Sequence, residues 1–155
     1  MSGTETSSGP SAGPLPRVLA ETRDDFLALD VKDRLQLLLE FSNELPALPA
    51  EYEDHPDLLE RVEECQSPVF IFVEVEDGVV TMHATAPREA PTTRGFASIL
   101  AQGLSGLSVR EVLDDVPDDY PQTIGLGVAV SPLRVRGMTA LLARAKRQVR
   151  AKSAA

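Results

Sequence analysis

Two apolar segments joined by Asp77-Gly78 constrain the fold of this chain more than any other feature. Residues 69–76 and 79–86 are rich in Val, Ile, Phe and Thr, and only these two residues separate them. Asp-Gly favours a type I′ turn, because both central residues of such a turn need a positive φ. The sequence therefore predicts a two-stranded antiparallel hairpin.

The two-residue turn also determines which residues of the hairpin lie opposite each other. Ile71 faces Ala84 on one side of the predicted ribbon, and Phe72 faces His83 on the other. All the pairs on the first side are apolar, whereas the second side mixes aromatic residues with Thr, Glu and His. We expect helices to pack on the first side and the second side to be half buried.

Most of the remaining chain has the spacing of apolar residues that is typical of amphipathic helices. The predicted helices cover residues 15–29, 31–45, 92–104 and 108–116 and the segment after Pro132. Asp30 and Ser131 are the expected N-caps of the second and the last helix, and Ser108 with Glu111 forms a capping box. In the last helix Leu141, Leu142, Ala145 and Val149 should face inward and the basic residues outward. Residues 50–64 should be irregular, with one helical turn at 56–61, and residues 124–130 an irregular segment or a short helix. The predicted fold class is α+β, with helices packed on one face of a small antiparallel sheet.

Composition narrows the class of protein. Beyond Met1, residues 1–14 hold no large apolar side chain, so we expect a disordered tail there, followed by a single domain over residues 15–152. No apolar run is long enough to span a bilayer, and no secretory signal is visible, so a cytoplasmic protein without membrane contact is expected. The formal net charge of −9 argues against nucleic acid as a partner.

Cys65 is the only cysteine of the chain, and it lies just before the first predicted strand. One cysteine cannot form an internal disulfide or a Cys-based metal site, and His55 and His83 lack the spacing of a metal-ligand pair. Glu63, Glu64, Gln66 and Ser67 surround it, which is too polar for a core position.

Cys65 lies four residues before Val69, whereas the register places His83 opposite Phe72, three residues beyond Val69. At ~3.3 Å per residue the two side chains are more than ~15 Å apart, so His83 is a poor base for Cys65. The neighbouring glutamates would raise the thiol pKa. The pattern indicates a thiol that is not activated by its own surroundings. We expect it to rest in a shallow apolar hollow near Val62 and Val69.

Several stretches of the chain together match the motifs of one known family. The stretch Arg61-Val62-Glu63-Glu64-Cys65-Gln66-Ser67 resembles the cysteine loop of the SufE family of sulfur-acceptor proteins, and Leu45-Pro46-Ala47-Leu48-Pro49 is similar to the end of that family's opening helices. Arg94-Gly95 matches a basic residue and glycine that open a helix, and residues 131–138 match a Ser-Pro-x-Arg-x-x-Gly stretch. The resemblance covers about residues 16–152. It departs from the family at Glu63 and Glu64, where a proline and a glycine are usual, and at Ala129, where a histidine is often found.

The resemblance implies that Cys65 accepts persulfide sulfur from a pyridoxal-phosphate cysteine desulfurase of the SufS type, stimulates that enzyme and passes the sulfur to an iron–sulfur scaffold. The cofactor would belong to the partner, and this chain would need none. Arg61, Gln66, Ser67, Arg94 and Arg134 are the candidates for supporting the loop or docking the partner. The competing interpretations are an adaptor with an incidental cysteine, an autonomous thiol enzyme and an iron–sulfur scaffold, the last of which would need more ligands than one cysteine and two distant histidines.

Overall fold

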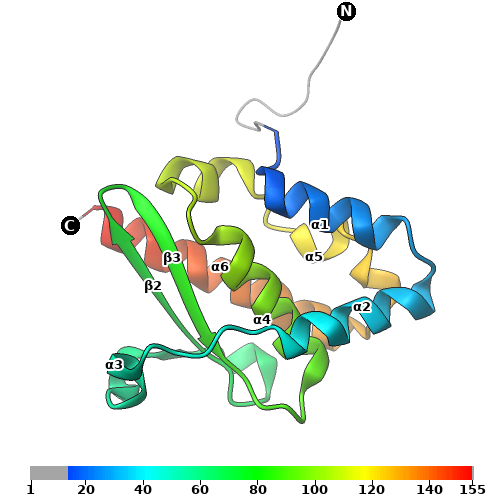
Figure 1. The fold of residues 1–155 in the computed structure, drawn as a ribbon, viewed down its shortest axis with the longest axis horizontal. Coiled ribbons are helices and arrows are strands. Elements are labelled where there is room, and N and C mark those ends of the chain that lie inside the picture. The colour runs from blue at the N-terminus through cyan, green and yellow to red at the C-terminus, as the bar shows by residue number, and fades with distance from the viewer. Residues whose placement is uncertain (1–13, 155) are drawn as a thin grey trace, which may run out of the picture.

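The computed structural model describes residues 14–154, so the predicted tail at residues 1–14 lies outside the described residues except for Pro14. The helices are α1 (Arg17–Leu27), α2 (Val31–Asn43), α3 (Ala50–Glu53), α4 (Pro91–Leu104), α5 (Tyr120–Thr123) and α6 (Pro132–Ser153). The strands are β1 (Glu60–Arg61), β2 (Phe70–Glu76) and β3 (Val79–Thr85). Short 3-10 turns lie at η2 (Pro56–Leu58), η3 (Glu63–Cys65) and η5 (Leu126–Val128), and a π-helical turn at η4 (Glu111–Asp115). Figure 1 shows the hairpin of β2 and β3 along one side of the molecule, with the long helices gathered beside it.

The hairpin has the predicted register. Ile71 pairs with Ala84 and Phe72 with His83, and Asp77 and Gly78 at the turn have φ values of 52° and 77°. The apolar side is covered by α4 and α6 and is buried except for the partly exposed Val75. The opposite side is partly buried, and its His83 side chain is 16% exposed. The α+β prediction, with helices on one face of a small antiparallel sheet, is confirmed.

The sheet has a third, very short strand that the sequence analysis did not predict. In β1, Glu60 pairs with Ile71 and Arg61 with Phe70, so the sheet order is β1-β2-β3. The helical turn expected at residues 56–61 ends earlier, at Leu58. Two residues are too few to show an alternating pattern, so this strand had no periodic signal.

Helix α4 lies at the centre of the helical layer and packs against α1, α2, α6 and β3. Two glycines make this close packing possible. A Cβ at Gly95 would lie 2.3 Å from the Leu38 carbonyl oxygen of α2, and one at Gly103 would lie 2.3 Å from Leu19 Cδ2 of α1. Both helices therefore approach α4 more closely than any residue with a side chain would permit.

The predicted caps are confirmed. Asp30 Oδ1 accepts a hydrogen bond from the Asp33 amide at 2.9 Å, and Ser131 Oγ accepts one from the Arg134 amide at 3.3 Å. Ser108 and Glu111 bond each other's backbone amides, as expected of a capping box, although the turn they open becomes π-helical at Glu111. These local bonds fix where α2, the turn after Ser108 and α6 begin.

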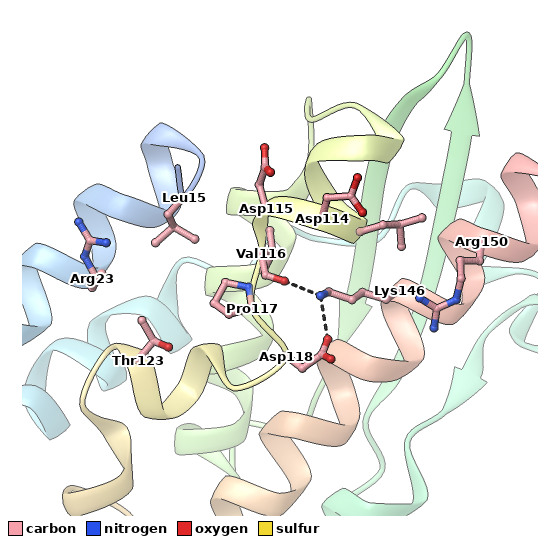
Figure 2. Close-up of a pocket in the computed structure, with 11 residues that line it drawn as sticks. Leu15, Arg23, Asp114, Asp115, Val116, Pro117, Asp118, Thr123, Lys146 and Arg150 are labelled. Atoms are coloured by element: carbon pink, nitrogen blue, oxygen red, sulfur yellow. Dashed lines mark hydrogen bonds and ion pairs between the residues drawn. The ribbon is translucent and has the colours of Figure 1, made fainter. Parts of the chain in front are cut away.

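The prediction that all basic residues of α6 face outward is wrong for Lys146. Leu141, Leu142, Ala145 and Val149 are buried as predicted, but the basic residue Lys146 is also buried, at 4% exposure. Its Nζ donates to the Val116 carbonyl oxygen and, at 2.8 Å, to Asp118 Oδ1. Figure 2 shows this lysine crossing from α6 to the segment after η4. A long aliphatic stem lets the ammonium leave the core and reach these oxygens, which a rule based on residue type alone does not anticipate.

Candidate functional site

Cys65 ends the short turn η3, which bridges β1 and β2. Its amide donates to the Val62 carbonyl at 3.1 Å, and the Val62 amide donates to the Val69 carbonyl at 2.9 Å. Val62 and Val69 are fully buried and anchor the two ends of the loop in the core. The thiol therefore lies on a short loop whose two ends are buried and hydrogen-bonded to each other.

Gln66 follows η3 and turns the chain of this loop back toward β2. Its φ of 62° lies in the left-handed region, which a residue with a Cβ adopts at a cost of roughly 1 kcal/mol. Its amide bonds the Glu63 carbonyl at 3.3 Å, and Ser67 then leads back toward the sheet. The exposed Gln66 thus shapes the loop through its backbone conformation, and its predicted docking or supporting role stays a prediction.

The cysteine packs directly on α6. Cys65 Sγ lies 3.6 Å from the Gly137 carbonyl oxygen, a contact in which the thiol is the donor. A Cβ at position 137 would lie 3.3 Å from both the Cα and the Sγ of Cys65. Gly137, which belongs to the Ser-Pro-x-Arg-x-x-Gly stretch, therefore leaves the space that the cysteine occupies.

A pocket of about 230 Å³ opens beside the thiol. Its lining residues are Glu64, Cys65, Gln66, Ser67, Thr93, Ser131, Leu133, Arg134 and Gly137. They come from the cysteine loop and from the first turns of α4 and α6. The thiol is half buried, as expected, but the expected apolar hollow is wrong, because most of the residues around it are polar.

Arg144 of α6 holds the cysteine loop with its whole guanidinium group. Nε and Nη2 donate to the two carboxylate oxygens of Glu64 at 3.0 and 3.3 Å, and Nη1 donates to Glu60 Oε2 at 2.8 Å and to the Arg61 carbonyl at 3.3 Å. Glu60 also bonds Gln148 Nε2 at 2.7 Å and pairs with Arg147. This bidentate arrangement clamps both sides of the loop onto the helix.

The electrostatic surroundings keep the thiol protonated. Burial, and after it the nearby Glu64 carboxylate, raise the pKa of Cys65 to about 11, and the opposing effect of Arg144 is smaller. The predicted lack of activation is confirmed in this respect. Since only the thiolate is a good nucleophile, the resting site reacts slowly at neutral pH.

His83 is engaged elsewhere. Its Nε2 lies 2.6 Å from Glu74 Oε2 on the outer side of the hairpin, and its ring packs 5.1 Å from that of Tyr52. It does not line the pocket beside Cys65.

The predicted arginines divide into two groups. Arg134 lines the pocket and donates to Thr92 Oγ1 at 3.0 Å. Arg94 instead donates to the carbonyls of Ser42 at 2.9 Å and Ala86 at 2.5 Å, which ties α4 to the ends of α2 and β3.

Arg61 is exposed, and its guanidinium lies 5.9 Å from the Phe70 ring centre. The structure thus brings Cys65, Gln66, Ser67 and Arg134 together at one pocket and leaves the side chains of Arg61 and Arg94 outside its lining.

Sequence reasoning missed Arg144 and Thr93. Arg144 is one of seven basic residues between positions 134 and 152, and nothing local distinguishes it from the others.

Within the described residues no cluster of three or more His, Cys, Asp or Glu side chains could hold a metal ion. The helices at residues 14–154 include none that is long and apolar enough to cross a membrane.

Comparison with known proteins then identifies the family. The family model described as "SufE: Fe-S metabolism associated domain" matches residues 20–149, which is most of the chain. The chain belongs to the SufE family. It is 51% identical over 137 residues to an uncharacterized SufE-like protein of Mycobacterium tuberculosis, which covers 88% of this chain and 94% of that protein.

More distant relatives share the same domain. An uncharacterized SufE-like protein of Synechocystis is 31% identical over 124 residues, covering 79% of this chain and 74% of that protein. The solution structure of a hypothetical protein from Thermus thermophilus superposes with a TM-score of 0.78 at 38% identity, covering 91% of this chain and 99% of that one. The SufE fold and the association with iron–sulfur metabolism therefore extend to this chain.

Proposed function

We propose that this SufE-family protein is a sulfur carrier whose acceptor atom is Cys65 Sγ. The sulfur donor is a persulfide on a pyridoxal-phosphate cysteine desulfurase of the SufS type, and the recipient is an iron–sulfur scaffold. The observation that carries the proposal is the combination of a half-buried, protonated thiol with a polar pocket at the same sulfur.

The transfer is a displacement of one sulfur by another. The Cys65 thiol first loses its proton to a base at the docked site, and the thiolate then attacks the outer sulfur of the donor's persulfide. An S–S bond forms on Cys65, the S–S bond of the donor breaks, and the donor cysteine leaves as a thiolate. No electrons are gained or lost overall, and the desulfurase regains the free cysteine that it needs for another turnover.

The surroundings of Cys65 fit a carrier better than an autonomous thiol enzyme. A catalyst acting alone needs a depressed thiol pKa and an adjacent base, whereas here the pKa is raised to about 11 and His83 is bonded to Glu74. A thiol that becomes reactive only in a partner's site avoids oxidation and misdirected sulfur transfer between encounters.

The test mixes the protein with a cysteine desulfurase from the same source, free cysteine and pyridoxal phosphate, followed by intact mass spectrometry. We expect the gain of one sulfur atom, together with faster desulfurase turnover, and the loss of both effects in Cys65→Ser. A Cys65→Ser protein that still stimulates the enzyme would favour the adaptor interpretation instead. A wild-type protein that gains no sulfur from any desulfurase of the same source would refute the proposed carrier function.

A further inference from the structure

The pocket beside Cys65 contains a polar group that the resting protein does not use. Thr93, in the first turn of α4, lines the pocket and is only 4% exposed. Its hydroxyl has no hydrogen-bond partner among residues 14–154, although most buried hydroxyls have one. A buried donor without a protein partner is available to a group from outside the described residues.

The start of α4 has further unused donors at the same place. Its N-cap residue, Ala90, has no side-chain oxygen, and the structure shows no capping hydrogen bond there. Arg94 is the first residue of the helix whose amide bonds back to the Ala90 carbonyl, so within the described chain the Thr93 amide is not hydrogen-bonded. Free amides and the positive end of the helix dipole favour an anion at this position.

The other lining groups also suit a small anion attached to the cysteine. Arg134 lines the pocket and donates to Thr92 Oγ1 at 3.0 Å, which adds a positive charge at its edge, and Cys65 itself provides the point of attachment. Glu64 carries the opposing charge at the rim, but its carboxylate is already bonded to Arg144. A volume of about 230 Å³ accommodates one additional sulfur atom next to Sγ.

We propose that this pocket binds the outer sulfur of a Cys65 persulfide as its anion, with the Thr93 hydroxyl as the donor that the resting thiol leaves unused. This assignment rests on the proposed carrier function and adds the group that recognises the loaded form. Thr93 is a positioning residue for the carried sulfur, and it stabilises the loaded state without contributing to the resting one.

The experiment loads Cys65 chemically, so that no desulfurase is needed. The Cys65 thiolate attacks tetrasulfide dianion, a new S–S bond forms on the protein, and trisulfide dianion leaves. The loaded protein is then alkylated at a series of pH values, and mass spectrometry measures the product that retains both sulfur atoms. The variants are Thr93→Val, which removes the hydroxyl with little change of shape, and Thr93→Ser, which keeps it.

We expect the midpoint of the persulfide alkylation profile to move upward by about one pH unit in Thr93→Val, since one hydrogen bond to an anion is lost. Thr93→Ser should keep the wild-type midpoint. The alkylation rate of the unloaded thiol should stay within about twofold in both variants, because the resting thiol bonds Gly137 rather than Thr93.

An unchanged midpoint in Thr93→Val would overturn the assignment, as would an equal change in the unloaded thiol, which would indicate general loosening of the loop. A wild-type Cys65 that takes up no sulfur from tetrasulfide would overturn it too. Failure of a desulfurase to load Cys65, with the Thr93→Val shift still present, would leave the pocket intact and refute the proposed function alone.

Discussion

Arg144 offers the sharpest test of how the cysteine loop is controlled. Its guanidinium makes four hydrogen bonds to Glu64 of the cysteine loop and to Glu60 and Arg61 of β1, so we expect Arg144→Met to release the loop and expose Cys65 more often. Met keeps much of the aliphatic stem but has no donor. The expected result is faster alkylation of Cys65 in the native protein.

The size of the effect follows from the exposure of the partners. The Glu64 side chain is 39% exposed and that of Glu60 is 21% exposed, so each ionic contact is screened and contributes well under its buried value. Two such contacts together are worth roughly 1.5 kcal/mol. Since about 1.4 kcal/mol corresponds to a factor of ten, the open population should rise about tenfold.

The sign of the change distinguishes this explanation from simple electrostatics. The positive charge of Arg144 lowers the pKa of Cys65, so its removal alone would raise that pKa and slow alkylation. Release of the loop has the opposite effect. A faster reaction therefore cannot arise from loss of the Arg144 charge alone.

The assay is pseudo-first-order alkylation with iodoacetamide at neutral pH, followed by intact mass spectrometry, with circular dichroism to verify that the fold is intact. Arg150→Met is the matched control, because Arg150 is an exposed arginine of the same helix whose side chain has no hydrogen bond to the loop in the described part of the chain. If Arg144→Met is slower than wild type, or no faster than Arg150→Met, the clamp does not govern exposure of the thiol.

Three further outcomes follow from the structure. The alkylation rate of Cys65 should rise about tenfold per pH unit from neutral pH toward a thiol pKa of about 11, and a plateau near pH 8 would contradict the raised pKa. Gly95→Ala should lower the free energy of unfolding by about 1–3 kcal/mol in urea titrations, because its Cβ would overlap α2, whereas Gly127→Ala, whose Cβ meets nothing closer than 3.9 Å, should cost less than about 1 kcal/mol. Lys146→Met should cost about 1–3 kcal/mol in the same titration, since the Val116 carbonyl loses its donor, and an unchanged midpoint would contradict the structural role of this lysine.

The parts of the fold that were predictable are those specified by neighbouring residues. Asp77-Gly78 determines the hairpin register because a two-residue turn leaves no other pairing, and Asp30 and Ser131 specify helix starts through bonds to amides three residues away. Each of these signals operates over a few residues, so each is readable without knowledge of the tertiary structure.

The parts that were not predictable depend on which distant segments meet. Arg144 and Glu64 are 80 positions apart, and their ion pair exists only because α6 crosses the cysteine loop. Lys146 is buried for a similar reason. The segment after η4 supplies the Val116 carbonyl oxygen and Asp118 Oδ1 as its acceptors, and the sequence of α6 alone does not predict these contacts. Thr93 looks like an ordinary residue of a helix until the pocket beside Cys65 is seen.

Glu64 links the departure from the family pattern to the control of the thiol. The sequence analysis noted that this position usually holds a glycine. Here its carboxylate has two effects at once: it fastens the loop to Arg144, and it raises the pKa of Cys65. A glycine could do neither. A partner that placed a carboxylate against Arg144 would compete for the clamp, free the loop and leave the Glu64 charge able to move away from the sulfur. Exposure and activation of Cys65 would then occur together and only in the complex. Under the proposed carrier function, the clamp is therefore the physical feature on which discrimination between partner enzymes should depend.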